Sequence, residues 1–567
     1  MINTPVEIIP LGGLGEFGMN CLALRYDGSM IIIDVGLMFS EVGHYGVDIM
    51  IPDFSYVEEH RDELLAIVLT HSHEDHIGAL PFLLQAVNVP VYGTPYTLSV
   101  ADRKLDEHKL TDCTQTHTIH AGESFTVGPF TVEFIRVSHS TVDCVALAVT
   151  TPVGVVIHTG DYKFDETPVC GDAIDIERLK EYGRRGVLAL LSDSTNVERP
   201  GRMPSERAVI PALEDIFDQT DGRIFVSCFA SSIHRIQIIL DLADDFGRSV
   251  FPVGRGMLRS LETADQNGFL RIPDGLLLTA SEYKQTNSED VVVLATGCQG
   301  EPMAAMSRMA NQNHKQAIIE AGDTVILSAR QIPGNEKSIS RLINECYKRN
   351  AFVTFIDQCY KRNAFVYDSS SARIHVSGHG AQEDLRLMIE STRPRYFIPI
   401  HGEYRQLYRH KLYACQELDY EPENVILMQS GEVLALDGER ALISDKIQVG
   451  KIYMDDSRSV IVDEAVMRDR KHLAYDGIII PVLVVNKETG EMKTEPEIAT
   501  CGYMLLDGNE EWMDELKDVI NQTLTTVPYD ERSDMSAFKE KIRLGLKRYI
   551  QKLTKQRPTI LPVIMQV

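Results

Sequence analysis

The chain has 567 residues, of which 44% are hydrophobic and 24% are charged, a composition that excludes an intrinsically disordered protein. Its length exceeds the size at which a single hydrophobic core stops growing, so we expect about three domains. The 82 acidic residues outnumber the 56 lysines and arginines and give a net charge of −26, which excludes nucleic-acid binding through bulk electrostatics.

The first two hundred residues alternate short β-branched apolar runs with Gly, Asp and His turns. This rhythm is typical of the strands of a layered α/β sandwich, with helical periodicity between some of them. The expected strands are 6–9, 20–25, 30–34, 66–70, 130–137, 153–158 and 188–192, and the expected helices are 81–87 and 95–108.

A turn-rich segment, ERPGRMPSER, predicts a domain boundary after Asn196 and precedes an expected helix over 205–219. From there to about residue 370, helical patterns alternate with buried strands, which indicates a second, parallel α/β unit. Its expected strands include 224–228, 291–295 and 324–328.

The last part of the chain predicts a small α+β domain after a charged linker. Its expected order is a strand in GIIIPVLVV, a strand in GYMLL, two helices and a final strand in TILPVIMQV. The predicted organisation is a first domain in two parts, 1–204 and 371–450, with an insertion at 205–370 between them. A linker at 451–479 and a C-terminal domain at 480–567 follow.

One internal repeat interrupts the second unit. The segment CYKRNAFV occurs at 346–353 and again at 359–366, an offset of thirteen residues. Thirteen is not a whole number of helical turns, so the second copy cannot extend a helix in phase and is expected to form a loop.

No feature of the sequence indicates a membrane protein or a disulfide framework. The longest apolar runs fall far short of the roughly 18 residues that a membrane span needs, and the start, MINTPVEIIP, lacks a basic signal region. We therefore predict a cytoplasmic location and no membrane partner. The ten cysteines include no CxxC pair, which argues against both disulfides and a thiolate zinc knuckle.

Basic residues gather near the C-terminus, where eight lysines and arginines between 539 and 557 face one acid, Glu540. We interpret them first as a solvated helix face, and a nucleic-acid or partner patch is the alternative. Near the other end, HYGVDIMIPDF carries Asp48 and Asp53. A turn held by carboxylate-to-backbone bonds is the favoured interpretation there, with a structural calcium ion as the alternative.

The strongest chemical signal is the segment LLAIVLTHSHEDHIGALP. An apolar strand ends at Thr70 and is followed at once by His71, His73, Asp75 and His76. Imidazoles and carboxylates at this density beyond a strand are typical of a site for zinc or another divalent metal. His71 and His73 project to the same side of an extended backbone and can chelate one ion, while Asp75 and His76 turn towards a second.

Further ligands are expected where other apolar strands end: His139 in FIRVSHS, Asp161 in VVIHTGDYK and His401 in YFIPIHGEY. The set completes two coordination spheres with one carboxylate left over as a bridge. Asp34 ends another strand, in MIIIDVG, and is expected to orient a ligating imidazole without binding metal itself.

These motifs resemble the metallo-β-lactamase fold, and further motifs make the chain similar, nearly end to end, to the ribonuclease J family of β-CASP nucleases. The further motifs are PLGGLGEFGMN, SDSTNVERPG, FASSIHR, PGNEKSI, HVSGHG and RPTILPVIMQV. The resemblance implies an αββα sandwich with an inserted β-CASP α/β domain and a small C-terminal α+β domain. The repeat is a departure, because removing one copy restores the usual spacing between PGNEK and HVSGHG.

The resemblance also implies a set of site residues. One Zn²⁺ is implied at His71, His73 and His139 and another at Asp75, His76 and His401, with Asp161 as the bridge and Mn²⁺ or Mg²⁺ as substitutes in vitro. Asp75, Asp193 and His379 are the implied catalytic residues, with His379 facing the scissile phosphate. The implied pocket for a 5′ phosphate comprises Ser231, Ser232, His375, Val376, Ser377, Gly378 and His379.

The activity implied by the resemblance is hydrolysis of RNA by two-metal-activated hydroxide, in RNA maturation and decay. It combines 5′-to-3′ exonuclease action on single-stranded, 5′-monophosphorylated RNA with endonuclease action. Implied partners are RNA, further copies in a homodimer or homotetramer, and an RNA-decay complex. The alternatives are a DNA-directed β-CASP nuclease, an acyl (thioester or lactone) hydrolase of the same superfamily, and a non-catalytic scaffold.

Overall fold

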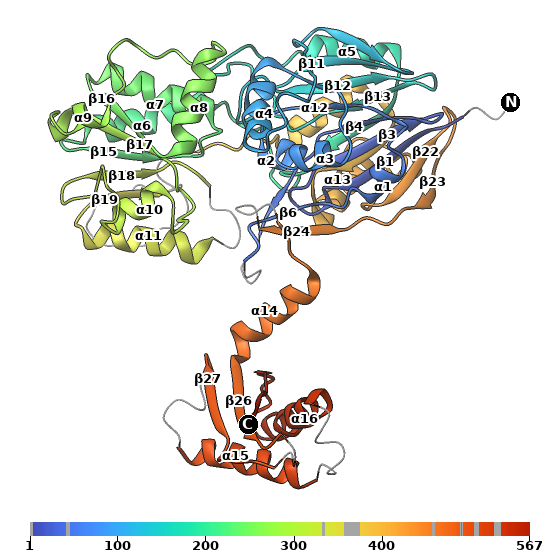
Figure 1. Cartoon of the computed structure of the whole chain (residues 1–567). Coiled ribbons are helices and arrows are strands. Elements are labelled where there is room, and N and C mark those ends of the chain that lie inside the picture. The colour runs from blue at the N-terminus through green and yellow to red at the C-terminus, as the bar shows by residue number, and fades with distance from the viewer. Residues whose placement is uncertain are drawn as a thin grey trace. The chain divides into compact units, whose positions relative to one another are not determined.

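A computed structural model describes residues 4–40, 46–330, 335–355, 375–455, 460–487, 489, 491–503, 510–526 and 535–567. The chain divides into two compact units (Figure 1). Unit 1 comprises Met1–Phe39 and Met50–Ile452, and unit 2 comprises Ser40–Ile49 and Tyr453–Val567. None of the helices in the described residues has the length and apolar character that a membrane crossing requires.

Unit 1 begins with two sheets packed face to face. The larger has the spatial order β23 (Ala441–Lys446), β22 (Glu432–Leu436), β1 (Val6–Gly12), β3 (Cys21–Tyr26), β4 (Ser29–Ile33), β7 (Leu64–Val68), β8 (Val91–Gly93) and β9 (Thr116–Thr118). The smaller has the order β10 (Ser124–Val127), β11 (Phe130–Arg136), β12 (Val145–Thr150), β13 (Val155–His158), β14 (Val187–Asp193) and β20 (Pro394–Ile400). Ile8 and Val68 of the larger sheet share one buried core with Phe134 and Leu191 of the smaller.

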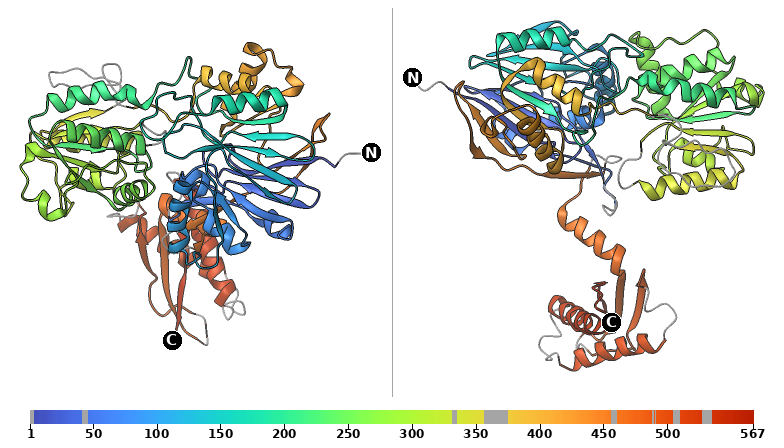
Figure 2. Two further views of the ribbon diagram at one scale, coloured as in Figure 1. Left: turned by 90° about the horizontal axis from the view of Figure 1, so that it is seen from above. Right: turned by 180° about the vertical axis from the view of Figure 1, so that it is seen from behind.

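Helices cover the outer faces of both sheets (Figure 2). Against the smaller sheet lie α5 (Ile176–Arg185), α12 (Gln382–Thr392) and α13 (Tyr404–Glu417), whose Leu179, Met388 and Ala414 join Phe397 in one core cluster. The larger sheet is accompanied by α1 (Ser55–Glu59), α2 (Glu74–Ile77), α3 (Leu80–Ala86) and α4 (Pro95–Glu107), of which α4 contacts β8 and β9. The predicted αββα sandwich is confirmed.

Between β14 and β20 the chain inserts a five-stranded parallel sheet. Its order is β16 (Ser249–Val253), β17 (Val291–Ala295), β15 (Ile224–Ser227), β18 (Thr324–Leu327) and β19 (Phe352–Phe355). Successive side chains point to opposite faces, so Val226 packs in one core cluster and Phe225 in another. This two-faced burial is typical of a parallel sheet and agrees with the predicted inserted α/β domain.

Helices flank this inserted sheet on both faces. The first cluster includes side chains of α6 (Ile210–Asp218), α7 (Ile233–Asp245) and α8 (Arg255–Gln266), and the second those of α10 (Ala305–Ala310) and α11 (Glu336–Lys348). Shorter helices are η1 (Glu206–Val209), α9 (Ala280–Tyr283) and η2 (Ser288–Asp290).

The start of the insertion and the repeat near its end differ in how they compare with the expectation. The continuous helix expected over 205–219 was wrong in detail, because it is the short 3₁₀ turn η1 followed by α6. Pro211, in the first turn of α6, has no N–H to continue the hydrogen bonding of the preceding turn. The first copy of the repeat spans the end of α11 and the start of β19. The second copy, 359–366, lies outside the described residues.

Unit 2 holds a small sheet packed against two helices. Its elements are α14 (Glu464–Asp476), β26 (Ile478–Val485), β27 (Glu497–Cys501), α15 (Glu510–Thr525), α16 (Met535–Thr554), β28 (Thr559–Ile560) and β29 (Val563–Gln566). Residues of β26 alternate between buried and half-buried, and the buried Leu483 shares a cluster with Ile520 of α15 and Phe538 of α16. The C-terminal α+β domain is confirmed.

The details of unit 2 differ from the prediction in two places. The strand described next to GYMLL is β27, which ends at Cys501 and alternates between exposed and half-buried residues, while Gly502 and Tyr503 lie outside any strand. Of GYMLL itself, residues 504–506 lie outside the described residues. The segment expected as a linker, 451–479, contains α14, which starts at an Asp463 cap whose side chain accepts from the Ala465 N–H. Further short elements are the strands β5 (Met38–Phe39), β6 (Ile49–Pro52), β24 (Lys451–Asp455) and β25 (Val460–Ile461) and the 3₁₀ turn η3 (Pro422–Asn424).

Candidate metal centre

The site forms where strands of both sheets of the sandwich end. In the larger sheet, β4 and β7 are parallel with Ile33 opposite Val68, so Asp34 and Thr70 emerge side by side. Asp34 accepts hydrogen bonds from the Thr70 N–H and hydroxyl, both at 2.8 Å. In the smaller sheet, β14 and β20 are parallel with Asp193 opposite Ile400, which places His401 next to Asp193.

Three histidines and one aspartate gather into a first group that could hold a metal ion: His71, His73, His139 and Asp161. His73 Nδ1 lies 3.1 Å from His71 Nε2 and 3.1 Å from His139 Nε2. Three ring nitrogens that converge on one point are the arrangement expected around a shared cation. Burial lowers the pKa of His73 to about 4, which keeps its imidazole in the neutral form that binds metal.

A second group shares Asp161 and adds Asp75, His76 and His401. Asp161 Oδ2 lies 3.3 Å from His76 Nε2, while its Oδ1 lies 3.5 Å from His401 Nε2. Burial alone would lower the pKa of His76, but the carboxylates of Asp161, Asp75 and Asp34 raise it to about 10. This part of the site therefore favours positive charge, which a divalent cation can supply in place of protons.

Asp161 provides the clearest sign that the residues present fit a metal. Its side chain is buried, and its Oδ1 has no hydrogen-bond partner among the described residues. A buried carboxylate oxygen without a partner is costly unless a cation satisfies it. Its Oδ2 lies 3.6 Å from His71 Nε2 in the first group and 3.3 Å from His76 Nε2 in the second, so the carboxylate lies between the two groups. The residues therefore fit a divalent metal centre.

Each imidazole is oriented by a partner on its far side. His76 Nδ1 donates to Asp34 at 2.8 Å, and His139 Nδ1 donates to the Gly378 carbonyl at 2.8 Å. Such partners fix the tautomer and aim the other ring nitrogen at the metal. Asp34 thus lies beside an imidazole, as expected from the sequence. The role of the Gly378 carbonyl could not be predicted from the sequence.

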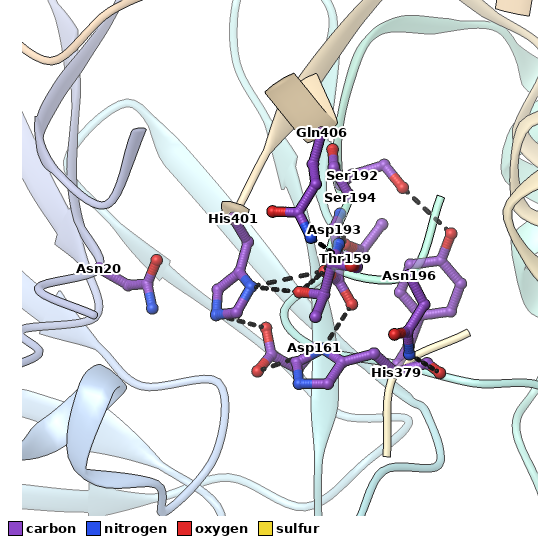
Figure 3. Close-up of polar contacts among 12 residues, drawn as sticks. Asn20, Thr159, Asp161, Ser192, Asp193, Ser194, Asn196, His379, His401 and Gln406 are labelled. Carbon is purple, nitrogen blue, oxygen red and sulfur yellow. Dashed lines mark hydrogen bonds and ion pairs between the residues drawn. The ribbon is translucent and has the colours of Figure 1, made fainter. Parts of the chain in front are cut away.

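His401 is held by Asp193, the last residue of β14, and by Thr195, two residues later. Its Nδ1 lies 2.8 Å from the Thr195 hydroxyl. The same nitrogen lies 3.4 Å from Asp193 Oδ1 (Figure 3). Its backbone φ of 54° is an uncommon conformation for a non-glycine residue and turns the chain sharply after β20. Sequence reasoning missed Thr195, and also Asn20, whose side-chain amide lies 3.1 Å from His76 Nε2.

His379 lies against the same cluster and is paired with Asp193. Their Nδ1 and Oδ2 atoms are 2.8 Å apart, and the His379 side chain is 21% exposed. Burial alone would lower the pKa of His379, but Asp193 and Asp161 raise it. The Asn196 amide donates to the His379 carbonyl at 2.9 Å (Figure 3). It also donates to the Ser377 hydroxyl at 2.9 Å, and the two bonds fix this segment.

The residues expected to form a phosphate pocket come from two segments. Ser231 and Ser232 precede α7, and Ser232 is its N-cap residue without a side-chain cap hydrogen bond. In the other segment, Val376 packs in the same core cluster as Ile233 of α7. Gly378 lies so close to His139 that an added Cβ would be 2.7 Å from the ring. The described structure contains no hydrogen bond that joins either serine directly to 375–379.

A buried ionic network supports these two segments and was not expected from the sequence. Glu206 Oε2 accepts a hydrogen bond from Arg235 Nη2 at 2.6 Å, and Lys163 Nζ lies 3.6 Å from Glu206 Oε1. All three side chains are at most 2% exposed. Burial and, to a smaller extent, the positive charge of Arg235 together lower the pKa of His375 to about 3, so this imidazole is neutral.

The alternative calcium site gains no support from the structure. Asp53 Oδ1 accepts hydrogen bonds from the Ser55 N–H at 2.9 Å and hydroxyl at 2.6 Å, as in the favoured turn interpretation. Neither Asp53 nor Asp48 belongs to a potential metal-binding group among the described residues.

Four family models match the chain in succession. Residues 46–225 match the beta-lactamase superfamily domain, and 221–346 match the ribonuclease J beta-CASP domain. Residues 371–428 match the Zn-dependent metallo-hydrolase RNA specificity domain, and 465–567 match the ribonuclease J C-terminal domain. The order of the matches agrees with a sandwich that is interrupted by an insertion and followed by a C-terminal domain.

Whole-chain comparisons give the same result. The chain is 36% identical to ribonuclease J2 of Bacillus subtilis over 562 residues, which cover 99% of both chains. It is 38% identical to ribonuclease J of Synechocystis over 502 residues, 88% of this chain and 76% of the relative. A solved protein of unknown function from Enterococcus faecalis matches with a TM-score of 0.51 at 15% identity, over 76% of this chain and 100% of that one. That structure is similar in fold alone.

Proposed function

Because the chain belongs to the ribonuclease J family of metallo-β-lactamase and β-CASP nucleases, we propose that it degrades and matures RNA from the 5′ end. The proposed main activity is 5′-to-3′ exonuclease action on single-stranded RNA with a 5′-monophosphate, and the additional activity is internal cleavage. The observation that carries the proposal is that residues 377–379 lie directly against the metal centre, because His139 donates a hydrogen bond to the Gly378 carbonyl.

The proposed cofactor is a pair of Zn²⁺ ions, with Mn²⁺ or Mg²⁺ able to replace them in vitro. The first ion would be held by His71, His73 and His139 and the second by Asp75, His76 and His401, with Asp161 shared. When bound, the ions supply Lewis-acid stabilisation of the charge that develops on the phosphodiester and activate the water for attack.

His379 is the proposed general acid of the reaction. Its Nδ1 is paired with Asp193, which favours the imidazolium form and leaves Nε2 free to act on the substrate. Breaking the bond between phosphorus and the 3′ oxygen requires a proton on that leaving oxygen, and His379 can donate it. The products are a nucleotide with a 3′ hydroxyl and an RNA that again carries a 5′-monophosphate. Each cycle therefore regenerates the preferred end.

The pocket proposed for that end combines Ser231, Ser232, Ser377 and the Gly378 backbone. The first N–H groups of α7 have no partner within the helix, and Ser232 at its N-cap leaves its hydroxyl available. Helix N-termini and small hydroxyl side chains suit a terminal phosphate because they can donate hydrogen bonds at close range. Anchoring the end here places the first internal phosphate towards the metal centre.

We also propose that unit 2 mediates association into a homodimer or homotetramer. Its strand β29 pairs only with β26 among the described strands, and Val563 and Met565 on it are 41% and 47% exposed. Edge strands with exposed apolar side chains pair readily with a second copy. Membership of an RNA-decay complex is part of the same proposal.

The test is degradation of matched oligonucleotides with 5′-monophosphate, 5′-triphosphate or 5′-hydroxyl ends, and of the DNA equivalent. Zinc or manganese is supplied, and a chelator serves as the control. Release of mononucleotides that favours the 5′-monophosphate RNA is expected. Preference for the DNA strand would indicate the DNA-directed nuclease instead. Turnover of thioesters without nucleic-acid cleavage would indicate the acyl hydrolase.

A Ser377→Leu substitution tests the pocket itself. The Ser377 hydroxyl accepts from the Asn196 amide and from the His379 N–H, so a bulky apolar side chain both blocks the pocket and removes these contacts. We expect the rate of 5′-end-dependent degradation to fall about tenfold more than the rate of internal cleavage of a circular RNA. A tenfold difference is the effect of about one lost hydrogen bond to the phosphate. The exposed Ser281→Leu is the matched control. Equal losses in both assays would contradict the pocket.

A further inference from the structure

Phe17 presents an apolar ring to solvent at the edge of the metal centre. It is 42% exposed, and its ring centroid lies 6.3 Å from that of His401 in an edge-on arrangement. The loop around it is fixed, because β2 (Leu14–Gly15) pairs with β21 (Gly402–Glu403) and the Met19 N–H donates to the Leu37 carbonyl at 3.0 Å. The ring is therefore held in place beside a metal-binding histidine.

Two further exposed rings continue from Phe17 along α13. Tyr404 and Tyr408 are 49% and 47% exposed and lie four residues apart, which places them on one face of the helix. Tyr404 borders the Phe17 loop, because an added Cβ on Gly15 would lie 4.0 Å from the Tyr404 Cβ. We call Phe17, Tyr404 and Tyr408 the aromatic rim. A single exposed ring needs no explanation, but a row beside a catalytic centre does.

The aromatic rim and the proposed phosphate pocket contact different parts of the metal centre. Gly378, in the pocket segment, contacts His139 of the first metal group, whereas Phe17 contacts His401 of the second. A strand anchored by its 5′ phosphate in the pocket crosses the metals at its first internal phosphodiester. The nucleotides on the 3′ side of that bond would then lie on the His401 side of the centre, next to Phe17.

We propose that the aromatic rim stacks against unpaired bases of the RNA on the 3′ side of the scissile phosphate. The proposal rests on the proposed ribonuclease function and adds a binding site to it. Every base has a π-face, so stacking on aromatic side chains holds a strand without selecting its sequence. A base-paired strand cannot offer these faces, which makes the rim selective for single strands.

Stacking, and not charge, is the basis of this site. Arg405 and Arg409 lie next to the tyrosines on α13, but both are within 3.4 Å of the Glu198 carboxylate. Arg405 also lies 3.6 Å from Glu403. The rim therefore has little net positive charge, and binding through flat apolar surfaces suits a chain with a net charge of −26.

The experiment compares kcat/KM for a 5′-monophosphorylated decamer with that for a dinucleotide, using metal-loaded full-length protein. The Phe17→Ala and Tyr404→Ala variants are tested with Phe17→Trp and Tyr404→Phe, which keep a stacking surface. Phe246→Ala is the matched control, because Phe246 is 37% exposed and lies at the end of α7. Metal content is measured for every variant.

We expect the alanine variants to lower the decamer-to-dinucleotide ratio about tenfold, the effect of one or two lost stacking contacts. The aromatic replacements and Phe246→Ala should keep the ratio. For the wild type, abasic sites at the second to fourth positions of the decamer should lower the ratio as much as the alanine substitutions do. For the alanine variants, the abasic sites should lower it no further. The slope of kcat/KM against salt should not change.

The aromatic rim and the proposed ribonuclease function would be contradicted by different results. A wild-type ratio in both alanine variants, with full metal content, would overturn the aromatic rim while leaving the proposed function intact. An equal penalty for abasic sites in wild type and variants would do the same. Failure of the wild type to cleave any of these RNAs would instead overturn the proposed function.

Discussion

The His76→Ala variant is expected to lose at least about a thousandfold in hydrolytic activity and to remain folded. His76 Nε2 faces Asp161 Oδ2 at 3.3 Å, and its Nδ1 donates to Asp34 at 2.8 Å. The substitution therefore removes a donor from the second metal group and leaves two buried carboxylates without their shared partner. One metal ion should be lost from each chain.

Three measurements on the purified variant test this expectation: metal content by mass spectrometry, cleavage of 5′-monophosphorylated RNA, and circular dichroism. His410→Ala is the matched control, because His410 is also fully buried but lies outside the potential metal groups among the described residues. It should keep the metal content of the wild type. Full activity of His76→Ala with an unchanged metal content would contradict the assignment of two metal groups.

Much of the metal centre could be predicted because its side chains follow apolar strands. Asp161 follows β13, Asp193 ends β14 and His401 follows β20, and these three strands are parallel neighbours in one sheet. The ends of parallel neighbours meet at one edge, so the order of strands brings together residues that are more than two hundred positions apart. The dense His and Asp motif after β7 supplied the remaining signal.

The groups that orient this centre could not be predicted in the same way. Thr195 and His401 are 206 residues apart, and nothing about a threonine in a turn indicates that it will hold an imidazole. The Gly378 carbonyl is a backbone atom, whose role depends on how closely the chain passes His139. Both contacts arise from the packing of distant segments and therefore leave no local pattern.

The buried ion pair of Glu206 and Arg235 could not be predicted from the local sequence either. Glu206 and Arg235 lie in segments that resemble ordinary solvated helix starts, yet they form an ion pair with both side chains at most 2% exposed. The partner that makes such burial tolerable is provided by another part of the fold. Burial of a charge can therefore be recognised only when the tertiary structure is known.

The Glu206→Ala variant is expected to lower the stability of unit 1 by about 3–5 kcal/mol at neutral pH, because it leaves buried cations without their carboxylate. Arg235 Nη2 lies 2.6 Å from Glu206, and Lys163 Nζ lies 3.6 Å away, with Asp165 as its other carboxylate neighbour at 3.9 Å. Thermal unfolding followed by circular dichroism measures the loss. The exposed Glu177→Ala removes only a surface pair with Lys180 and should change the midpoint little.

The pH dependence separates lost charge pairing from lost packing. Burial alone would raise the pKa of Glu206, but Arg235 and Lys163 lower it to about 2, from 4.5 in the unfolded chain. A carboxyl group whose pKa is lowered by folding stabilises the protein above its unfolded pKa and loses that effect as pH falls towards its folded pKa. The difference in stability between wild type and Glu206→Ala should therefore be full at pH 7 and shrink between about pH 4.5 and 2. A difference that stays constant across this range would show that Glu206 contributes through packing and not through its charge.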